Sequence, residues 1–248
     1  MRSANGHTIV WGANGGVGRA VIRHLCDDGS PVIAYVRDPE TIASLAEKYT
    51  NLLVRSFEIT EQFYKTEAKF LQDAGYKIIG MVDCVGSVAA HDKSDLAERF
   101  SDIFVPNVQH AYYATYCFED VLLPDASVVL MSSIRAVTGT DNDNIEYSMA
   151  KAALENLTRS LMYKFQSKQI RVNCIRCTPI ADTNMSSRWP KEIVEGLKRH
   201  SAYGELLAPD DVAELALFLL SAKSRALSGA ILEATNGFGL LSQATKPS

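Results

Sequence analysis

The sequence predicts an α/β protein, with a doubly wound parallel sheet of about seven strands flanked by helices in a single domain that spans 1–248. Two observations lead to this prediction. Short apolar runs alternate with stretches of helical periodicity along the chain, without a linker, an internal repeat or a low-complexity tract. The first apolar run is followed by a glycine-rich turn and then by a helical stretch.

The composition is that of an ordinary globular protein, with 47% hydrophobic residues, 22% charged residues and a net charge of −4. This charge gives no support for a nucleic-acid partner. The N-terminus has no signal-peptide pattern, and no apolar run is long enough to cross a membrane. We therefore expect a cytoplasmic protein without a membrane partner.

The cysteines indicate reduced thiols rather than a disulfide framework, because there are five of them, spread over the chain. Cys174 and Cys177 form a C-x-x-C, which could indicate zinc or a redox pair. The chain has no second C-x-x-C and no matching histidine pair, so no metal site is expected.

The glycine-rich turn favours a dinucleotide site. Thr8 to Trp11 is predicted as a strand and Ala20 to Cys26 as a helix. Glycines let the backbone turn tightly and approach a pyrophosphate, and the helix N-terminus offers it free N–H groups. A tight turn without a ligand is the alternative, which four glycines in seven residues disfavour. The candidate cofactor residues are Gly12, Asn14, Gly15, Gly16, Val17 and Gly18.

The end of the second predicted strand, Pro31 to Val36, indicates which cofactor binds. An acid at this position takes the 2′-hydroxyl of NAD, whereas an arginine accommodates the 2′-phosphate of NADP. Val36 stands at the position where an acid usually binds the ribose. Arg37 is then the residue that would contact the 2′-phosphate, which favours NADP(H). Asp38 can instead cap the next helix. NAD(H) remains an alternative, because a shift of one residue would place Asp38 where it can bind the ribose 2′-hydroxyl.

The middle of the chain continues the alternation of strands and helices. Small residues at the end of the fourth strand, in Asp83-Cys84-Val85-Gly86, would let a cofactor lie close, while Asp83 could simply bond a neighbouring loop. One long helix is predicted from Leu96 to Val121, with Pro106 either kinking it or starting its second part. The predicted elements are helix 39–48, strand 52–57, helix 61–73, strand 78–82 and helix 96–121.

Asn107 is a polar residue among apolar neighbours on that long helix. Its amide could face a groove, or it could be an ordinary surface asparagine.

A second group of polar residues follows the strand predicted at Ser127 to Met131. Ser133 lies at the strand end, and Tyr147 and Lys151 open a helix one turn apart on the same face. A neighbouring ammonium favours the phenolate form of a tyrosine, so such a phenol can work as an acid or base near neutral pH. Alone, this pair is a weak signal, since exposed helical pairs of this kind arise by chance.

The last third of the chain supplies two more strands and a predicted lid. Segment 184–206 is polar, irregular and partly helical, as expected of a cover over a substrate. The other predicted elements are strand 170–175, helix 209–220 and strand 229–234.

Taken in order, these motifs resemble the short-chain dehydrogenase/reductase family of the classical type, a Rossmann fold, over essentially the full chain. The glycine motif of that family stands as Trp11 to Gly18, and its Asn-Asn-Ala-Gly as Asp83 to Gly86. Its helix asparagine, catalytic serine and Tyr-x-x-x-Lys fall on Asn107, Ser133, Tyr147 and Lys151. Each motif alone is common, but the ordered set is specific.

The resemblance implies a mechanism for these four catalytic candidates. Ser133 would hydrogen-bond a substrate carbonyl, and Tyr147 would give or take the proton. Lys151 would favour the phenolate and bind the nicotinamide ribose, while Asn107 would hold a water that links Lys151 to solvent. Further cofactor contacts are implied for Glu58, Ile59, Val85, Gly86, Ile180 and Thr183.

The chain also departs from the family pattern. Trp11 replaces a small threonine, and Asp83 replaces an amide that braces the sheet. Gly15 stands where family members that use NADP often carry a basic residue. The family's Pro-Gly after the sixth strand is Cys177-Thr178, and its terminal Asp-Gly-Gly is 235–237, Thr-Asn-Gly.

The sequence thus predicts an oxidoreductase that moves a hydride between NADP(H) and a small or medium ketone or secondary alcohol, such as a 3-oxoacyl compound or a secondary-metabolite ketone. Two alternatives stay open: an NAD-dependent alcohol dehydrogenase, and a non-catalytic dinucleotide-binding regulator or scaffold. The resemblance further implies a homotetramer or homodimer.

Overall fold

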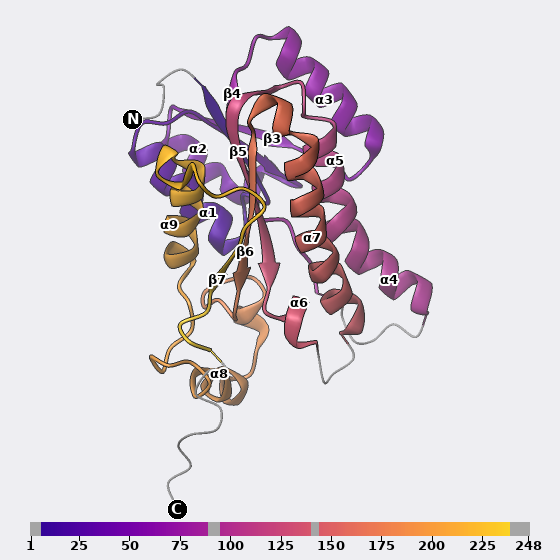
Figure 1. Ribbon diagram of the computed structural model, residues 1–248. Helices are drawn as coiled ribbons and strands as arrows, with labels where there is room; N and C mark the ends of the chain where they lie inside the picture. Colours follow the sequence, from indigo (N-terminus) through magenta and orange to yellow (C-terminus); the bar gives the residue numbers. More distant parts are fainter. Residues whose placement is uncertain (1–5, 89–94, 140–143, 239–248) are drawn as a thin grey trace, which may run out of the picture.

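The computed structural model describes residues 6–88, 95–139 and 144–238, and its centre is one sheet of seven strands (Figure 1). The strands lie in the order β3-β2-β1-β4-β5-β6-β7, and every neighbouring pair is parallel. This order runs outward in both directions from β1 and β4, so the predicted doubly wound Rossmann sheet is confirmed. The strands are β1 (His7–Trp11), β2 (Val32–Val36), β3 (Leu52–Ser56), β4 (Ile78–Asp83), β5 (Leu122–Ser133), β6 (Arg171–Cys177) and β7 (Ile231–Ala234).

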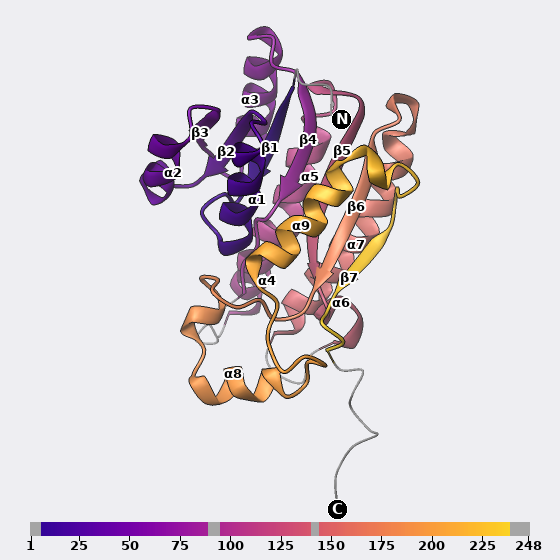
Figure 2. The ribbon, with the colours of Figure 1, turned by 90° about the vertical axis from the view of Figure 1, so that its left-hand side faces the viewer.

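Helices cover both faces of the sheet (Figures 1 and 2). α1 and α9 pack together on one face, and α3, α5 and α7 lie on the other. The α-helices are α1 (Gly16–Asp27), α2 (Ala43–Lys48), α3 (Glu61–Asp73), α4 (Leu96–Phe104), α5 (His110–Tyr116), α6 (Arg135–Thr138), α7 (Ile145–Lys164), α8 (Lys191–Lys198) and α9 (Pro209–Leu220). Short turns of other helix types are η1 (Pro39–Ile42), η2 (Val105–Gln109), η3 (Gln166–Lys168), η4 (Ser186–Arg188) and η5 (Ala222–Ser224).

The apolar runs of the sequence become strands because both faces of the sheet are covered. β2 is buried at every position, and β1 and β4 are buried at nearly every position. Strands of this kind carry continuous rather than alternating apolar residues. Their side chains divide between two cores, one under α1 and α9 and one under α3, α5 and α7.

The helix predicted over 96–121 is interrupted at Pro106, as predicted, but it ends at Tyr116 rather than Val121. α4 ends at Phe104, and the π-helical turn η2 leads into α5, which ends at Tyr116. Pro106 has no N–H to continue the ladder of α-helical hydrogen bonds, and the wider turn accommodates it. This turn carries Asn107, so the irregular backbone falls at a candidate site residue.

The fifth strand begins earlier than predicted, at Leu122 rather than Ser127. Its pairing with β4 shifts register between Ile78 and Gly80, where β5 holds an extra irregular stretch with Asp125 at φ 63°. Pro124 and Asp125 are typical turn residues, so the sequence predicts a strand only after them. β6 also extends two residues beyond its predicted end, to Cys177.

Candidate active site

The carboxyl ends of the parallel strands meet at one edge of the sheet, and the sheet order reverses there between β1 and β4. A ligand crevice is expected outside the strands at such a point. The glycine-rich turn follows β1, the loop 84–86 follows β4, and the candidate catalytic residues follow β5. Among the described residues, no helix is long and apolar enough to traverse a bilayer.

Close packing explains the glycines of the turn after β1. Gly12 has φ 68°, and a Cβ there would lie 2.8 Å from the backbone of Cys84 and Val85. A Cβ on Gly18 would overlap the carbonyl oxygen of Gly12. α1 begins at Gly16 with Gly15 as its N-cap, and no side chain caps its first turn. The first N–H groups of the helix therefore remain available to an anion.

Arg19 adds a feature that the sequence reasoning missed. Its guanidinium donates to the carbonyl oxygens of Asn14, at 3.1 Å, and Thr41. It thereby joins the glycine-rich turn to η1, which begins two residues after Arg37 in the sequence. Position 19 follows the last glycine of the motif, and only the fold reveals that its side chain reaches η1.

At the end of β2, Arg37 and Asp38 are both exposed. The carboxylate of Asp38 accepts a hydrogen bond from the backbone N–H of Glu40 at 3.1 Å, with Pro39 in the first turn of η1. The expected capping role of Asp38 is confirmed. The reading of the ribose by Arg37 stays a prediction.

Glu58, Ile59 and Val85, for which cofactor contacts are implied, follow the ends of β3 and β4. Glu58 is exposed and accepts a hydrogen bond from Thr60 at 3.1 Å, while Ile59 and Val85 pack against the core. The N–H of Val85 donates to the Asp83 carboxylate at 2.9 Å. Asp83 thus does bond its neighbouring loop.

The structure brings Asn107 and Lys151 together beside Gly86, with the Tyr147 ring next to Lys151. A Cβ on Gly86 would lie 3.1 Å from Asn107 Oδ1 and 3.5 Å from Lys151 Nζ. Lys151 is 4% exposed, and its ammonium donates to the carbonyl of Met131 at 2.9 Å. The same ammonium lies 5.6 Å from the centre of the Tyr147 ring. Lys151 is therefore buried next to the Tyr147 ring, so these two residues are not an exposed helical pair.

Asn107 is only 1% exposed, so the expectation of an ordinary surface asparagine is excluded. Its Nδ2 donates to the carbonyls of Ser87 and Ile103, each at 2.8 Å. Its Oδ1 is buried and has no partner among the described residues. An orphaned acceptor beside a lysine ammonium suits a bound water or a ligand hydroxyl.

Ser132 and Ser133 have different environments. Ser132 is buried, and its hydroxyl donates to Glu155 at 2.9 Å. Ser133 is partly exposed at the end of β5, where its oxygen accepts from the N–H of Arg135 at 3.3 Å. A hydroxyl can accept one hydrogen bond and donate another, so the Ser133 hydroxyl can also donate.

Glu155 stands one turn after Lys151 on α7 and belongs to a buried ion pair. Arg176 on β6 binds both of its carboxylate oxygens, at 2.8 and 2.6 Å. Burial by itself would raise the pKa of Glu155, but the hydrogen bonds from Arg176 and Ser132 lower it overall. This pair fixes α7 against β5 and β6 beneath the candidate catalytic residues.

The loop after β6 lies against the glycine-rich turn. A Cβ on Gly16 would be 2.9 Å from the carbonyl oxygen of Asp182 and 3.1 Å from Thr183. Thr183 is held by Ser186, with 3.0 Å between their hydroxyl oxygens, and Ile180 forms a bridge with Leu207. Thr183 is therefore next to the start of α1, where a ligand phosphate would bind.

The C-x-x-C residues do not converge. Cys174 packs in the core under α7, and Cys177 packs in the core on the opposite face of the sheet. Burial raises the pKa of each thiol to about 12. Two buried, protonated thiols on opposite faces do not make a redox pair.

By its fold and by the arrangement around Gly86, the molecule falls in the class of dinucleotide-binding oxidoreductases. A family model described as Enoyl-(Acyl carrier protein) reductase matches residues 12–239. The chain belongs to the short-chain dehydrogenase/reductase family, as a divergent member, and this family binds nicotinamide dinucleotides.

Individual relatives are distant but match along nearly their whole length. A tropinone reductase homolog of Arabidopsis thaliana is 26% identical, covering 96% of this chain and 95% of its own. A meso-2,3-butanediol dehydrogenase of Serratia marcescens is 23% identical, covering 96% of both chains. A short-chain dehydrogenase/reductase from Mycobacterium ulcerans has the same fold, with a TM-score of 0.85 at 20% identity, covering 97% of this chain and 92% of that one.

The residues present fit a nicotinamide dinucleotide. Gly12 and Gly18 let the turn pack closely against the loop after β4 and against itself, and the first turn of α1 is uncapped beside them. Near the ends of β4 and β5, Asn107 Oδ1 is an orphaned acceptor that lies, like Lys151 Nζ, against Gly86. The uncapped helix start and this orphaned acceptor thus both belong to the carboxyl edge of the sheet, where the fold places a dinucleotide.

Proposed function

We propose that this protein is an NADP(H)-dependent carbonyl reductase that interconverts a small or medium ketone and its secondary alcohol. The observation that carries this proposal is the approach of Lys151 Nζ and Asn107 Oδ1 to Gly86, with the Tyr147 ring 5.6 Å from the same ammonium. A tyrosine hydroxyl positioned at a substrate oxygen can act as a general acid or base. The nicotinamide supplies the hydride chemistry when it is bound.

In this proposal, the catalytic residues orient the carbonyl and move one proton. The Ser133 hydroxyl donates a hydrogen bond to the substrate oxygen, and the Tyr147 hydroxyl transfers its proton to that oxygen as the alcohol forms. Lys151 Nζ stabilises the phenolate and binds the nicotinamide ribose. Asn107 Oδ1 holds a water through which a proton returns from solvent. Gly12 to Gly18, Val85, Gly86, Ile180 and Thr183 bind the rest of the cofactor.

Loss of absorbance at the reduced-nicotinamide band, measured with a panel of ketones and aldehydes, tests the catalytic claim. Wild-type protein should consume NADPH, and Tyr147→Phe should reduce the rate by about 1,000-fold. Tyr163→Phe is the matched control, because Tyr163 is an exposed tyrosine on the same helix. Tight NADPH binding without turnover of any substrate would instead favour a non-catalytic dinucleotide-binding protein.

The NADP preference rests on Arg37, since Asp38 is already engaged in capping η1. Glu58 and Ile59 are proposed to border the adenine. We expect Arg37→Ala to weaken NADPH binding by about tenfold and to leave NADH binding within twofold. Fluorescence titration measures both affinities. An unchanged NADPH affinity would favour the NAD-dependent alcohol dehydrogenase.

We propose that the substrate enters the single domain beneath segment 184–206, which contains η4 and α8. The named relatives, a reductase homolog and a dehydrogenase of a small diol, are consistent with a compact carbonyl or alcohol. A 3-oxoacyl compound and a secondary-metabolite ketone both belong in the substrate panel. A cytoplasmic location is also proposed, because all five cysteines are free thiols.

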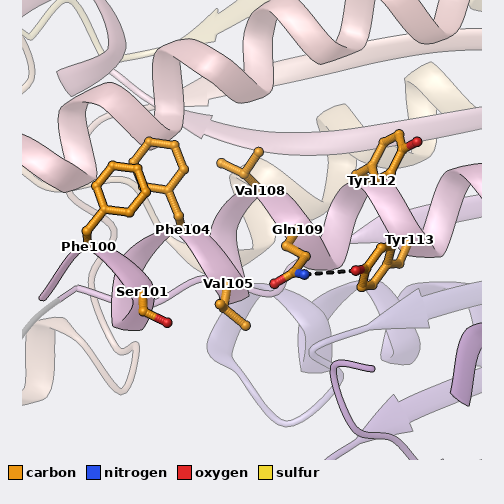
Figure 3. Close-up of a pocket in the computed structure, with 8 residues that line it drawn as sticks. All are labelled: Phe100, Ser101, Phe104, Val105, Val108, Gln109, Tyr112 and Tyr113. Atoms are coloured by element: carbon orange, nitrogen blue, oxygen red, sulfur yellow. Dashed lines mark hydrogen bonds between the residues drawn. The ribbon is translucent and has the colours of Figure 1, made fainter. Parts of the chain in front are cut away.

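A second copy of the chain is proposed to cover the outer face of α4, η2 and α5. An open groove of about 500 Å³ lies on this face, and Figure 3 shows the residues that line it. Phe100 and Phe104 stack there with ring centres 4.0 Å apart, and Gln109 donates to the Tyr113 hydroxyl at 2.8 Å (Figure 3). Exposed aromatic surface of this kind is typical of an interface. The family resemblance implies a homodimer or homotetramer through these helices.

Light scattering after gel filtration tests the assembly. Phe100→Glu should shift the protein to a smaller species, because the side chain is 43% exposed in the groove. Phe70→Glu is the control, at 42% exposure on α3, outside the groove. A monomeric wild-type protein would contradict the proposal.

A further inference from the structure

Three buried polar side chains, linked by hydrogen bonds, lie next to the loop after β4. His110 Nε2 is 3.1 Å from Asp83 Oδ1, and His110 Nδ1 hydrogen-bonds the hydroxyl of Tyr64. Their exposed fractions are 3% for Asp83 and 0% for both His110 and Tyr64. A carboxylate can only accept hydrogen bonds, so Nε2 is the donor to Asp83. With its hydrogen on Nε2, a neutral imidazole has an acceptor at Nδ1, so the Tyr64 hydroxyl donates a hydrogen bond to Nδ1.

The Asp83 carboxylate connects the other two side chains to the cofactor loop. The same oxygen that accepts from His110 also accepts from the N–H of Val85 at 2.9 Å. Val85 precedes Gly86, which abuts both Asn107 Oδ1 and Lys151 Nζ. One carboxylate oxygen therefore ties the loop after β4 to the first residue of α5.

His110 also follows the π-helical turn directly. η2 ends at Gln109, and Asn107 lies within it. A π-helical turn is a less regular backbone than an α-helix, so its position depends on the contacts at its ends. The His110 ring supplies such a contact on the side of the sheet.

Trp11 holds the histidine ring from a third direction. The two rings meet edge to face at 5.3 Å, and Trp11 stacks on Tyr35 with 4.0 Å between ring centres. These aromatic rings leave His110 little room to turn away from Asp83. Two departures from the family pattern, Trp11 and Asp83, thus belong with His110 to one packed set, which we call the His110 cluster.

We propose that His110 is a positioning residue of the active site. Its hydrogen bond to Asp83 fixes the loop that carries Val85 and Gly86 relative to the turn that carries Asn107. This inference rests on the proposed function, since the residues that it positions are those proposed to bind the cofactor and to relay the proton.

His110→Phe tests this role, because it keeps a ring in the aromatic cluster and removes both hydrogen bonds. Tyr35→Phe is the matched control. It removes a buried hydrogen bond, from Tyr35 to Glu67 at 2.7 Å, in the same aromatic cluster but away from the loop. His110→Gln retains a side-chain N–H that can reach Asp83 and serves as the conservative variant. The double variant Asp83→Asn/His110→Phe also removes the Asp83 charge, because this buried carboxylate loses a hydrogen-bond partner in His110→Phe.

Two readouts separate positioning from simple stability. Hydrogen exchange of the Val85 amide in the free protein reports on the loop itself, and the Kd for NADPH with kcat/KM reports on the site. We expect at least tenfold faster Val85 exchange in His110→Phe, with a loss of about tenfold in kcat/KM that persists in the double variant. His110→Gln should recover most of both effects, and Tyr35→Phe should change neither.

Equal behaviour of His110→Phe and Tyr35→Phe in both readouts would overturn the proposal and leave His110 as a packing residue. Wild-type protein that does not bind or consume NADPH would contradict the proposed function instead. The exchange of Val85 would still decide the positioning role in that case, because it is measured without cofactor.

Discussion

The catalytic set and the His110 cluster lie side by side at the same edge of the sheet, and they differ in how they relate to the family pattern. The catalytic set, Asn107, Ser133, Tyr147 and Lys151, matches it at every position. The His110 cluster departs from it at Trp11 and Asp83 and packs a histidine between them. Groups proposed to touch reacting atoms need one particular chemistry, whereas groups that hold them need only fix a position.

The largest expected effect sharpens the first half of this comparison. Lys151→Met should lower kcat/KM by about 100- to 1,000-fold, because the neutral side chain can neither favour the phenolate nor hold the ribose. Lys164→Met is the control on the same helix, where the lysine pairs with Glu119 on the surface. Steady-state kinetics with the best substrate of the panel decides it. Equal losses in both variants would break the assignment of Lys151.

Gly12→Ala would break the contact between the glycine-rich turn and the loop after β4. The new Cβ at φ 68° would meet the backbone of Cys84 and Val85 at 2.8 Å, so we expect a loss of at least about 3 kcal/mol in the free energy of unfolding.

Gly75→Ala provides the reference for that measurement. It has φ 75° but no atom within 4 Å of the new Cβ, so it should cost only about 1 to 2 kcal/mol. Urea unfolding gives both values. Equal losses would mean that the left-handed backbone alone, and no close approach to the loop, requires the glycine.

Glu155→Gln addresses the support beneath Lys151. The change should lower the free energy of unfolding at pH 7 by about 2 kcal/mol, because Arg176 loses its buried charged partner. The pKa of Glu155 is lowered in the folded state, so its stabilisation is complete above the usual carboxyl pKa of about 4.3. It is lost as the pH falls through the lowered value. Urea unfolding at pH 7 and pH 3 should therefore show a gap between the two proteins that shrinks in acid.

The smallest effect is expected far from the crevice, between α1 and α9. Asp210 binds His24 at 2.8 Å and Arg23 at 3.0 Å, and the hydrogen bonds from His24 and Arg23 lower its pKa. All three side chains are partly exposed to water, so Asp210→Asn should cost only about 0.5 kcal/mol above the usual pKa of about 3.9. This small stabilisation should disappear in acid. Thermal unfolding at pH 7 would contradict it with a loss as large as that of Glu155→Gln.

Local patterns predicted much of the fold and the candidate site. The apolar runs identified all seven strands, and the glycines after β1 identified the turn that packs on the loop after β4. Asn107 and Lys151 were selected from their motifs, and the fold brings both of them to Gly86. These features depend on the chemistry of single residues at fixed spacing, which a sequence displays directly.

Features that depend on distant partners were not predictable. The early start of β5 results from its pairing with β4. The sequence shows only that Asp83 replaces an amide of the family pattern. Its hydrogen bond with His110 was not predictable, because the two residues are 27 positions apart. The reach of Arg19 to Thr41 depends likewise on how α1 and η1 pack.

Transfer of deuterium from NADPH labelled at nicotinamide C4 tests the central claim most directly. After incubation with the active ketone of the panel, mass spectrometry of the alcohol should find the label on the former carbonyl carbon. Tyr147→Phe should give almost none in the same time, and Tyr163→Phe should match the wild-type protein. Binding of labelled NADPH without deuterium in any product, across the whole panel, would contradict the account.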